Sequence, residues 1–428
     1  MSSFHSFSES PRFIPKDERP VTTSFSEAFL DSVSCTRFGI QERYQEHFNE
    51  LRNGILEFCK DFQIPNVALK DLKAFEDALT SHKPLIPLER IRQVLLLFQK
   101  LEHLVANKEP LKEKPPGYLQ EAEHLYHLSE QYTSQVSLLE QVGILKEGKI
   151  TGIDGREYPI PTLEQIAQCL FERESELSVK RDQGFTKLLL VPFGMSLDAL
   201  REILKQFLLS YKQAHPAFDL DTDDPLYAWK DGYEGADIGD PPKMVYYPKS
   251  FDPDHHKGQT KTQILEEQDV TPGSFPGWTV HLFQPPDPTN QESKGFASVP
   301  REGQGTTHGE ETPRPSLEAG KSPNEYLSTL QEAQEDPNSP YHNESGLTPE
   351  DWILAFITHL EETGQPLDNY QNSEESITYL TGSFFPSIVD SAFVPCVYWI
   401  RDNRRAYLRR DDPRGRDGFV GVRSSVIV

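Results

Sequence analysis

The sequence predicts an α+β protein in which a helical N-terminal region precedes a part built from helices and strands. Three patterns support this class. Apolar residues recur at steps of three and four over 37–62, which places them on one face of a helix. The apolar run at 185–193 lies between two glycines and is typical of a buried strand. Over 377–428 the apolar residues recur with a period of two, as in strands.

The N-terminal region is expected to begin with a disordered segment at 1–25, which is polar and rich in Ser and Pro. A helical region at 26–142 follows, and a homo-oligomer could form through it. A charged linker with two adjacent prolines, KEPLKEKPPG at 108–117, interrupts this region because paired prolines stop a helix. The helices are expected over 37–62, 68–80, after Pro87 and over 118–142.

A hairpin and a connecting helix are expected at 143–183. Asp154-Gly155 separates two short β-like stretches, and Gly readily takes the positive φ that a hairpin turn needs. Thr162 is expected to cap the following helix, with Gln165 bonding back to it, and this helix runs to Gln183.

The third part, 184–428, begins with the strand at 185–193 and a helix capped by Ser196. Two apolar runs, 244–247 and 278–283, are predicted strands. The polar, Pro- and Gly-rich stretch at 287–322 is expected to be a mobile surface loop insertion. Ser322 and Thr348 each precede a proline and acidic residues, which predicts two further helix starts.

The composition of the chain argues against several classes of partner and location. The 428 residues carry a formal charge of -24, so a nucleic-acid partner is not expected. Apolar runs such as Val94 to Phe98 are far too short for a membrane span, and the N-terminus lacks a signal-peptide pattern, so we expect a cytoplasmic location. Four scattered cysteines without CxxC spacing predict no disulfide scaffold and no zinc knuckle.

Two acidic stretches have the residue types of metal ligands. Asp219 to Asp224 imitates the start of a helix–loop–helix calcium site, but Asp224 stands where that loop needs Gly and Lys230 where it needs Glu. A looser calcium site there stays open. Asp252 to His256 is interpreted as a solvated loop. We find no phosphate-binding glycine motif and no nucleophile motif, so we predict no enzyme, no metal and no cofactor.

The segment from Phe393 to Val428 differs in charge from the rest of the chain. It holds eight arginines against four aspartates, and no lysine occurs after Lys321. The guanidinium group offers a planar fork of donors, which suits recognition, although surface ion pairs with the aspartates are an equally plain interpretation. If 404–409 is a strand, Ala406 and Leu408 face the core, and Arg405, Tyr407 and Arg409 are exposed on the other side.

The motifs of this segment resemble the C-terminal core of the formylglycine-generating-enzyme type of C-type-lectin fold. The resemblance is closest to the variable proteins of diversity-generating retroelements, in particular a set found in bacteria of the candidate phyla. Stretches such as GFTKLLLVPFGMSLDALREIL and LTPEDWILAFITHLEETGQPLDNYQ also look like that set, so the resemblance covers 140–428. The motifs are Tyr398-Trp399, Arg404-x-Ala406, Asp412-Pro413-x-x-Arg416 and Gly421-Val422-Arg423.

The resemblance implies a lectin-like domain at 184–428 in which some residues form a fixed scaffold and others vary. In such systems error-prone reverse transcription rewrites adenine positions near the end of the gene. The implied scaffold residues are Tyr398, Trp399, Arg404, Ala406, Leu408, Asp412, Pro413, Arg416, Gly421 and Arg423. The implied ligand-binding residues are Ile400, Asp402, Asn403, Arg405, Tyr407, Arg409, Arg410, Gly415, Asp417 and Phe419.

The first functional hypothesis is therefore a non-enzymatic protein that binds a macromolecular ligand, a protein, through diversified residues. A second is an oxidase of the formylglycine-generating class. The sulfatase-modifying members of that class use a cysteine pair, and this segment has only Cys396. A third is a structural or assembly protein of a phage or cell envelope, to which the N-terminal helices would be suited.

Overall fold

The computed structural model describes residues 40–41, 44–62, 64–65, 75, 78–79, 88–108, 116–290, 292–370, 375–388 and 391–428. The chain forms two compact units that divide between Lys114 and Pro115, within the predicted linker. The predicted disordered segment 1–25 and most of the predicted helix 68–80 lie outside the described residues. The division places the predicted helix 118–142 in the second unit, so the expected region 26–142 belongs to both units.

The first unit contains two packed helices, α3 (Gln45–Asp61) and α5 (Leu88–Asn107). The apolar stripe predicted for the first helix is confirmed, since Phe48, Leu51, Ile55 and Phe58 are all buried. They pack with Phe98 and its neighbours on α5 in one hydrophobic cluster.

Four short helices begin the second unit. The single helix expected over 118–142 is wrong: α6 (Gly117–Tyr126) and α7 (Leu128–Gln141) are separated by His127, whose φ of 49° is left-handed. The predicted hairpin follows as β1 (Lys149–Thr151) and β2 (Glu157–Pro159). Thr162 and Gln165 form the predicted capping box, but this helix is also divided, into α8 (Leu163–Glu172) and α9 (Glu174–Asp182).

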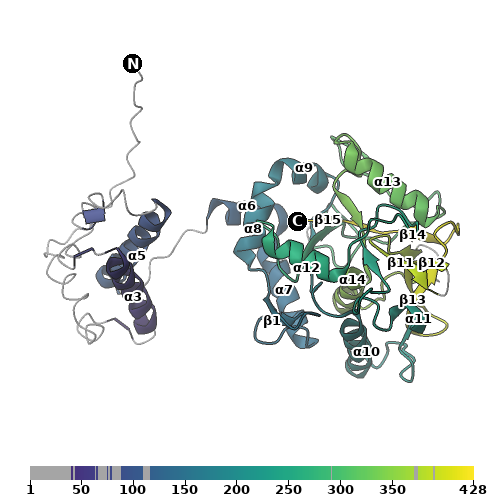
Figure 1. The fold of residues 1–428 in the computed structure, drawn as a ribbon, viewed down its shortest axis with the longest axis horizontal. Coiled ribbons are helices and arrows are strands. Elements are labelled where there is room, and N and C mark those ends of the chain that lie inside the picture. The colour runs from purple at the N-terminus through teal and green to yellow at the C-terminus, as the bar shows by residue number, and fades with distance from the viewer. Residues whose placement is uncertain are drawn as a thin grey trace, which may run out of the picture. The chain divides into compact units, whose positions relative to one another are not determined.

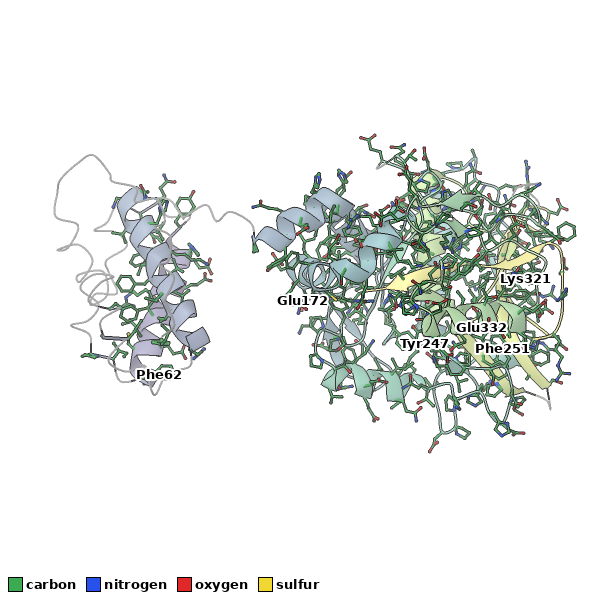
Figure 2. All side chains as sticks on the ribbon, turned by 90° about the horizontal axis from the view of Figure 1, so that it is seen from above. Phe62, Glu172, Tyr247, Phe251, Lys321 and Glu332 are labelled. Carbon is green, nitrogen blue, oxygen red and sulfur yellow. The ribbon has the colours of Figure 1, made fainter. Side chains whose placement is uncertain are left out.

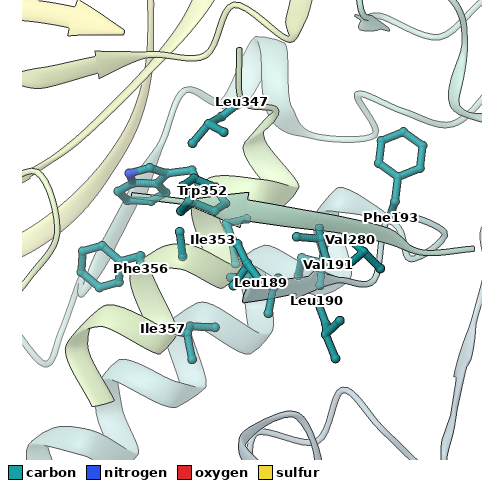
Figure 3. Packing of buried hydrophobic residues seen from close by; sticks show 14 of the residues in the cluster. Leu189, Leu190, Val191, Phe193, Val280, Leu347, Trp352, Ile353, Phe356 and Ile357 are labelled. Carbon is teal, nitrogen blue, oxygen red and sulfur yellow. The ribbon is translucent and has the colours of Figure 1, made fainter. Parts of the chain in front are cut away.

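A four-stranded antiparallel sheet lies at the centre of the second unit. Its strands, in order, are β3 (Lys187–Val191), β6 (Thr279–Phe283), β15 (Ser424–Ile427) and β9 (Glu344–Gly346). The apolar side chains of β3 and β6 pack with Trp352, Ile353 and Phe356 of α14 (Pro349–Thr363) (Figure 3). Since β15 is an inner strand, the C-terminal end of the described chain lies among the surrounding elements (Figure 1).

The outer edge of β3 is bound by side chains of α7. The amide of Gln135 accepts from the N–H of Leu190 and donates to the carbonyl of Leu188. Gln131 accepts from the N–H of Leu188 in the same way, at 2.8 Å. These bonds occupy backbone groups that would otherwise form an open strand edge, so α7 ends the sheet on this side.

A second sheet of seven strands carries the C-terminal segment. β12 (Ser391–Ile400) pairs with β13 (Arg405–Asp411) along one side and with both β10 (Ile377–Tyr379) and β11 (Ser383–Ile388) along the other. The order β14-β10-β12-β11-β5 is completed by β14 (Val420–Val422) and β5 (Val245–Tyr246), and β4 (Leu226–Ala228) pairs with β13 in parallel.

The remaining helices cover these sheets. α10 (Leu197–Ala214) packs on α14, and its cap is Ser196 as predicted. α13 (Pro323–Glu335) and α14 begin at Ser322 and Thr348 with capping boxes, which confirms both predicted starts. Two further helices are α11 (Lys230–Tyr233) and α12 (Lys261–Val270). Side chains from all these elements fill the second unit (Figure 2). Among the described helices, none has the length and apolar character needed to cross a bilayer.

The described residues of the stretch 287–322 are largely irregular, as expected for a loop insertion, but parts of the stretch are packed against the body of the unit. The stretch contains the two-residue strands β7 (Thr307–His308) and β8 (Arg314–Pro315), which pair with each other. Phe296, Val299 and Arg314 are buried, each with an exposure of 3% or less. Packing against residues far away in the chain holds these parts of the insertion against the body of the unit. The polar composition of the stretch gives no sign of such contacts.

Candidate functional site

The hairpin of β12 and β13 confirms the predicted alternation of side chains. Tyr398 lies opposite Tyr407, and Ile400 lies opposite Arg405. Ala406 and Leu408 are completely buried in the main core. Arg405, Tyr407 and Arg409 point to the other face of the sheet, because successive residues of a strand alternate.

Three tyrosine rings meet on this face. The rings of Tyr398 and Tyr407 stack with their centroids 5.2 Å apart and their planes 7° apart. Tyr227, brought beside Tyr407 by the parallel pairing of β4 with β13, lies 5.3 Å from it. Together with Arg405 and Arg409 these three rings form what we call the tyrosine–arginine face.

Tyr407 itself corrects one expectation. Its side chain was expected to be exposed, but only 7% of it is accessible, whereas Tyr227 at the rim is 36% exposed. The reason is lateral packing: Tyr398 and Tyr227 cover the ring from both neighbouring strands. Tyr407 thus lies on the outward face of its strand and is nevertheless buried by its neighbours on that face. The alternation of a strand determines the face of a side chain but not its exposure.

The two arginines hold the rings in place. The Nε of Arg405 donates to the Oη of Tyr407 at 2.8 Å, its guanidinium lies 4.9 Å from the ring centroid, and it pairs with Asp224. The Nη1 of Arg409 donates to the Oη of Tyr398 at 3.2 Å. Burial raises the pKa of the Tyr398 phenol despite Arg409, so the hydroxyl stays protonated at neutral pH. Tyr398 is 5% exposed and Tyr407 is 7% exposed, so the face presents mainly the ring of Tyr227 and the two fixed cationic groups.

The other predicted ligand-binding residues are only partly gathered on this face. Ile400 is half-buried opposite Arg405, and Asp402 and Asn403 are exposed in the turn at 401–404. Arg410 points to the opposite face, where its guanidinium lies 3.6 Å from the ring centroid of Phe393. Gly415 and Asp417 lie in the loop after β13, at the end of the strand away from the turn, about 20 Å along it.

Phe419 is linked to the face through a second arginine contact. Its ring is 58% exposed, and the guanidinium of Arg301 lies 4.5 Å from its centroid. Arg301 also donates to the carbonyl of Tyr370, whose ring meets that of Tyr398 edge to face at 5.6 Å. The contact chain from Phe419 to Tyr398 therefore extends the exposed aromatic surface toward the loop before β14.

Most of the implied scaffold residues are buried, and three, Arg404, Asp412 and Arg416, are exposed. Trp399, Ala406 and Arg423 have exposures of 6% or less. A Cβ at Gly421 would lie 2.5 Å from a side-chain carbon of Val299, so only glycine fits there. Arg404 and Arg416, in contrast, are exposed and pair with Asp219 and Glu325 respectively.

Sequence reasoning missed Tyr227 and the stacking of Tyr398 on Tyr407. Tyr398 was assigned to the scaffold, which fits its exposure of 5%, and the turn at 401–404 places it opposite Tyr407. That register could have been found by centring a hairpin on Asp402-Asn403, a pair typical of turns. Tyr227 gave no local signal, because only the long-range pairing of β4 with β13 brings it here.

Two other candidate chemistries find little support. Cys396 is buried, and its burial raises the pKa of the thiol far above its ordinary value, so the reactive thiolate is disfavoured. The side chain of Asp221 accepts from the N–H groups of Asp223 and Asp224, which uses the acidic stretch in a turn. Over the described part of the chain, no group of three or more His, Cys, Asp or Glu residues could hold a metal ion.

Comparison of the chain with family models, curated proteins and solved structures gives no match. The α+β class rests on the helices and strands described above. Any functional assignment has to come from the geometry of the tyrosine–arginine face and from the motifs that the C-terminal segment carries.

Proposed function

We propose that the protein is a binding protein in which residues 184–428 form a lectin-like domain that presents variable residues on the tyrosine–arginine face. The ligand is proposed to be a macromolecule, a protein. The observation that carries this proposal is the separation of roles within one hairpin. Ala406 and Leu408 fill the core, while Arg405 and Arg409 lie on the opposite, solvent-facing side.

The composition of this face supports recognition of a protein. Tyrosine and arginine are the residue types that supply most of the binding energy in protein interfaces, because they offer large rigid surfaces and several donors. Here the rings and guanidinium groups are already held by stacking and hydrogen bonds before any ligand arrives. Binding would therefore cost little side-chain ordering.

The proposal also explains which positions can vary. Asp402, Asn403 and Arg409 are exposed, and substitutions at such positions usually change stability by about 0.5 kcal/mol or less. Tyr407 is the exception among the proposed variable positions on β13, since its ring is packed. We therefore expect variation at 407 to favour large side chains.

A library experiment tests the proposal. The ten predicted ligand-binding positions are randomised, the full chain is displayed on phage, and the library is selected on an immobilised purified protein such as lysozyme. We expect folded variants that bind lysozyme and lose binding when the parental residues are restored. A control library, in which the eight exposed positions of α8 and α9 are randomised, is expected to give none.

Two outcomes would contradict the proposal. The first is that most members of the ten-position library fail to fold while the α8 and α9 library folds, because the face would then be structural. The second concerns the natural gene. Sequencing its 3′ end across many cells of the source is expected to show changes at adenine positions of these ten codons. The same sequence in every cell would argue against diversification.

A further inference from the structure

A cavity of about 400 Å³ lies apart from the tyrosine–arginine face, between the insertion at 287–322 and the junction of β14 with β15. Its volume falls in the range of sites for small molecules. Among the described residues that line it are Arg314, Arg423 and His308, and no aspartate or glutamate. None of the ten predicted ligand-binding residues lines it.

Both arginines at the cavity are buried, at 3% and 6% exposure. Arg314 donates to both carboxylate oxygens of Glu344 at 2.7 Å and to the hydroxyl of Ser424 at 3.1 Å. Arg423 donates to Asp368 at 2.6 Å and to the carbonyl of Ala297. These partners fix the two guanidinium groups as parts of the cavity wall.

Lys180 does not line the cavity, but with the two arginines, Glu344 and Asp368 it forms a group whose buried charges do not cancel. Lys180 is 2% exposed and donates to Glu344 at 2.7 Å, so this one carboxylate serves both Lys180 and Arg314. Burial alone would raise the pKa of Glu344, but the two cations hold it below its ordinary value. Asp368 pairs with Arg423. Three buried cations thus face two buried carboxylates, an arrangement that favours one more negative charge.

Donor groups of both arginines also remain without full partners. The Nε of Arg423 is buried and has no hydrogen-bond acceptor among the described residues. The Nη1 of Arg314 reaches only the side-chain oxygen of Gln284, at 3.3 Å. Burial, followed by the charge of Arg314, lowers the pKa of His308, so at neutral pH the imidazole adds a polar group and no further charge.

Apolar side chains also line the cavity. They are Phe283, Val299, Leu317 and Val422, with several prolines, beside polar residues such as Gln284 and Gln304. Apolar side chains beside two guanidinium forks suit a ligand with one charged end and a hydrocarbon body. A carboxylate matches the planar fork of arginine, and its single negative charge equals the buried excess.

We propose that this cavity binds a small organic monocarboxylate, with the carboxylate at Arg314 and Arg423 and the hydrocarbon body against Val299 and Leu317. A phosphate dianion fits less well, because it would replace an excess of positive charge with an excess of negative charge. The site is independent of the proposed function, since it shares no residue with the tyrosine–arginine face.

The proposal is tested with benzoate, phenylacetate and 3-phenylpropanoate, each compared with its primary amide and with inorganic phosphate. Binding to the full chain is measured by calorimetry. We expect saturable binding of at least one carboxylate, with its amide and phosphate at least about tenfold weaker. Equal binding of acid and amide, tighter binding of phosphate, or no binding by any of the three acids at about 10 mM would overturn the assignment.

A variant pair locates the site. Substitution of Arg423 would leave Asp368 buried without its partner and could prevent folding, so the wall is changed instead at Ser298, which is exposed and lines the cavity. Ser298→Phe is expected to weaken carboxylate binding at least about tenfold. The matched control Ser175→Phe, at an exposed position of α9, is expected to bind as the parent does. Unchanged binding in Ser298→Phe would place the ligand elsewhere.

Discussion

Replacement of Tyr407 by alanine tests the packing of the tyrosine–arginine face most directly. The substitution removes the stack on Tyr398, the ring contact with Tyr227 and the cation–π contact with Arg405. An aromatic pair contributes about 0.5–1.5 kcal/mol beyond burial, and an exposed cation–π contact about 0.5–1 kcal/mol. These contributions add to the loss of the ring's own burial, so we expect Tyr407→Ala to lower the free energy of unfolding by about 3–5 kcal/mol.

Tryptophan fluorescence during urea unfolding measures this change. All four tryptophans, Trp229, Trp278, Trp352 and Trp399, lie in the second unit, so the signal reports the unfolding of that unit alone. Tyr407→Phe keeps the stack and loses only the bond from Arg405, so a loss of about 1 kcal/mol or less is expected.

Phe171→Ala is the matched control, because Phe171 on α8 is 49% exposed. It is expected to change the free energy of unfolding by about 0.5 kcal/mol or less. If Tyr407→Ala costs no more than this control, the ring is not packed as described. Position 407 would then be as free to vary as its exposed neighbours.

Three further predictions concern buried ionisable groups. Burial, followed by the charges of Arg423 and Lys187, lowers the pKa of His359 from its ordinary value of 6.5 to about 3. Below pH 6.5 the unfolded state therefore binds more protons than the folded state. The stability that His359 contributes is complete above pH 6.5 and is lost as the pH falls, by about 1.4 kcal/mol per pH unit. Urea unfolding at several pH values should show a steeper loss of stability in the parent than in His359→Gln. Equal slopes in the two proteins would contradict this prediction. Glu344→Gln removes the carboxylate that Lys180 and Arg314 share, and it should lower the free energy of unfolding by about 3–5 kcal/mol in the same assay. A decrease below about 1 kcal/mol would show that the two cations find other partners. Cys396 should resist alkylation by iodoacetamide at pH 8 in the folded chain and react after unfolding, as followed by peptide mass mapping, because burial raises the pKa of its thiol; rapid reaction of the folded protein would refute this burial.

Local signals in the sequence predicted those parts of the fold that depend on a few neighbouring residues. The capping box at Thr162 and the helix starts at Ser322 and Thr348 form as expected, because the hydroxyl and the side chain three residues on bond within one helical turn. The alternation in β13 likewise follows from strand geometry. The break at His127 was missed, since no proline or glycine marks it.

The sequence by itself determined which C-terminal side chains face the core, because the period of a strand sorts Ala406 and Leu408 from Arg405 and Arg409. The tertiary structure decided how exposed those side chains are and what they meet. Tyr227 reaches Tyr407 from a strand far away in the chain, and Glu344 lies 30 residues from the Arg314 that it binds. Such contacts depend on the packing of the whole unit, and for that reason no local pattern announces the buried Tyr407 or the cationic cavity.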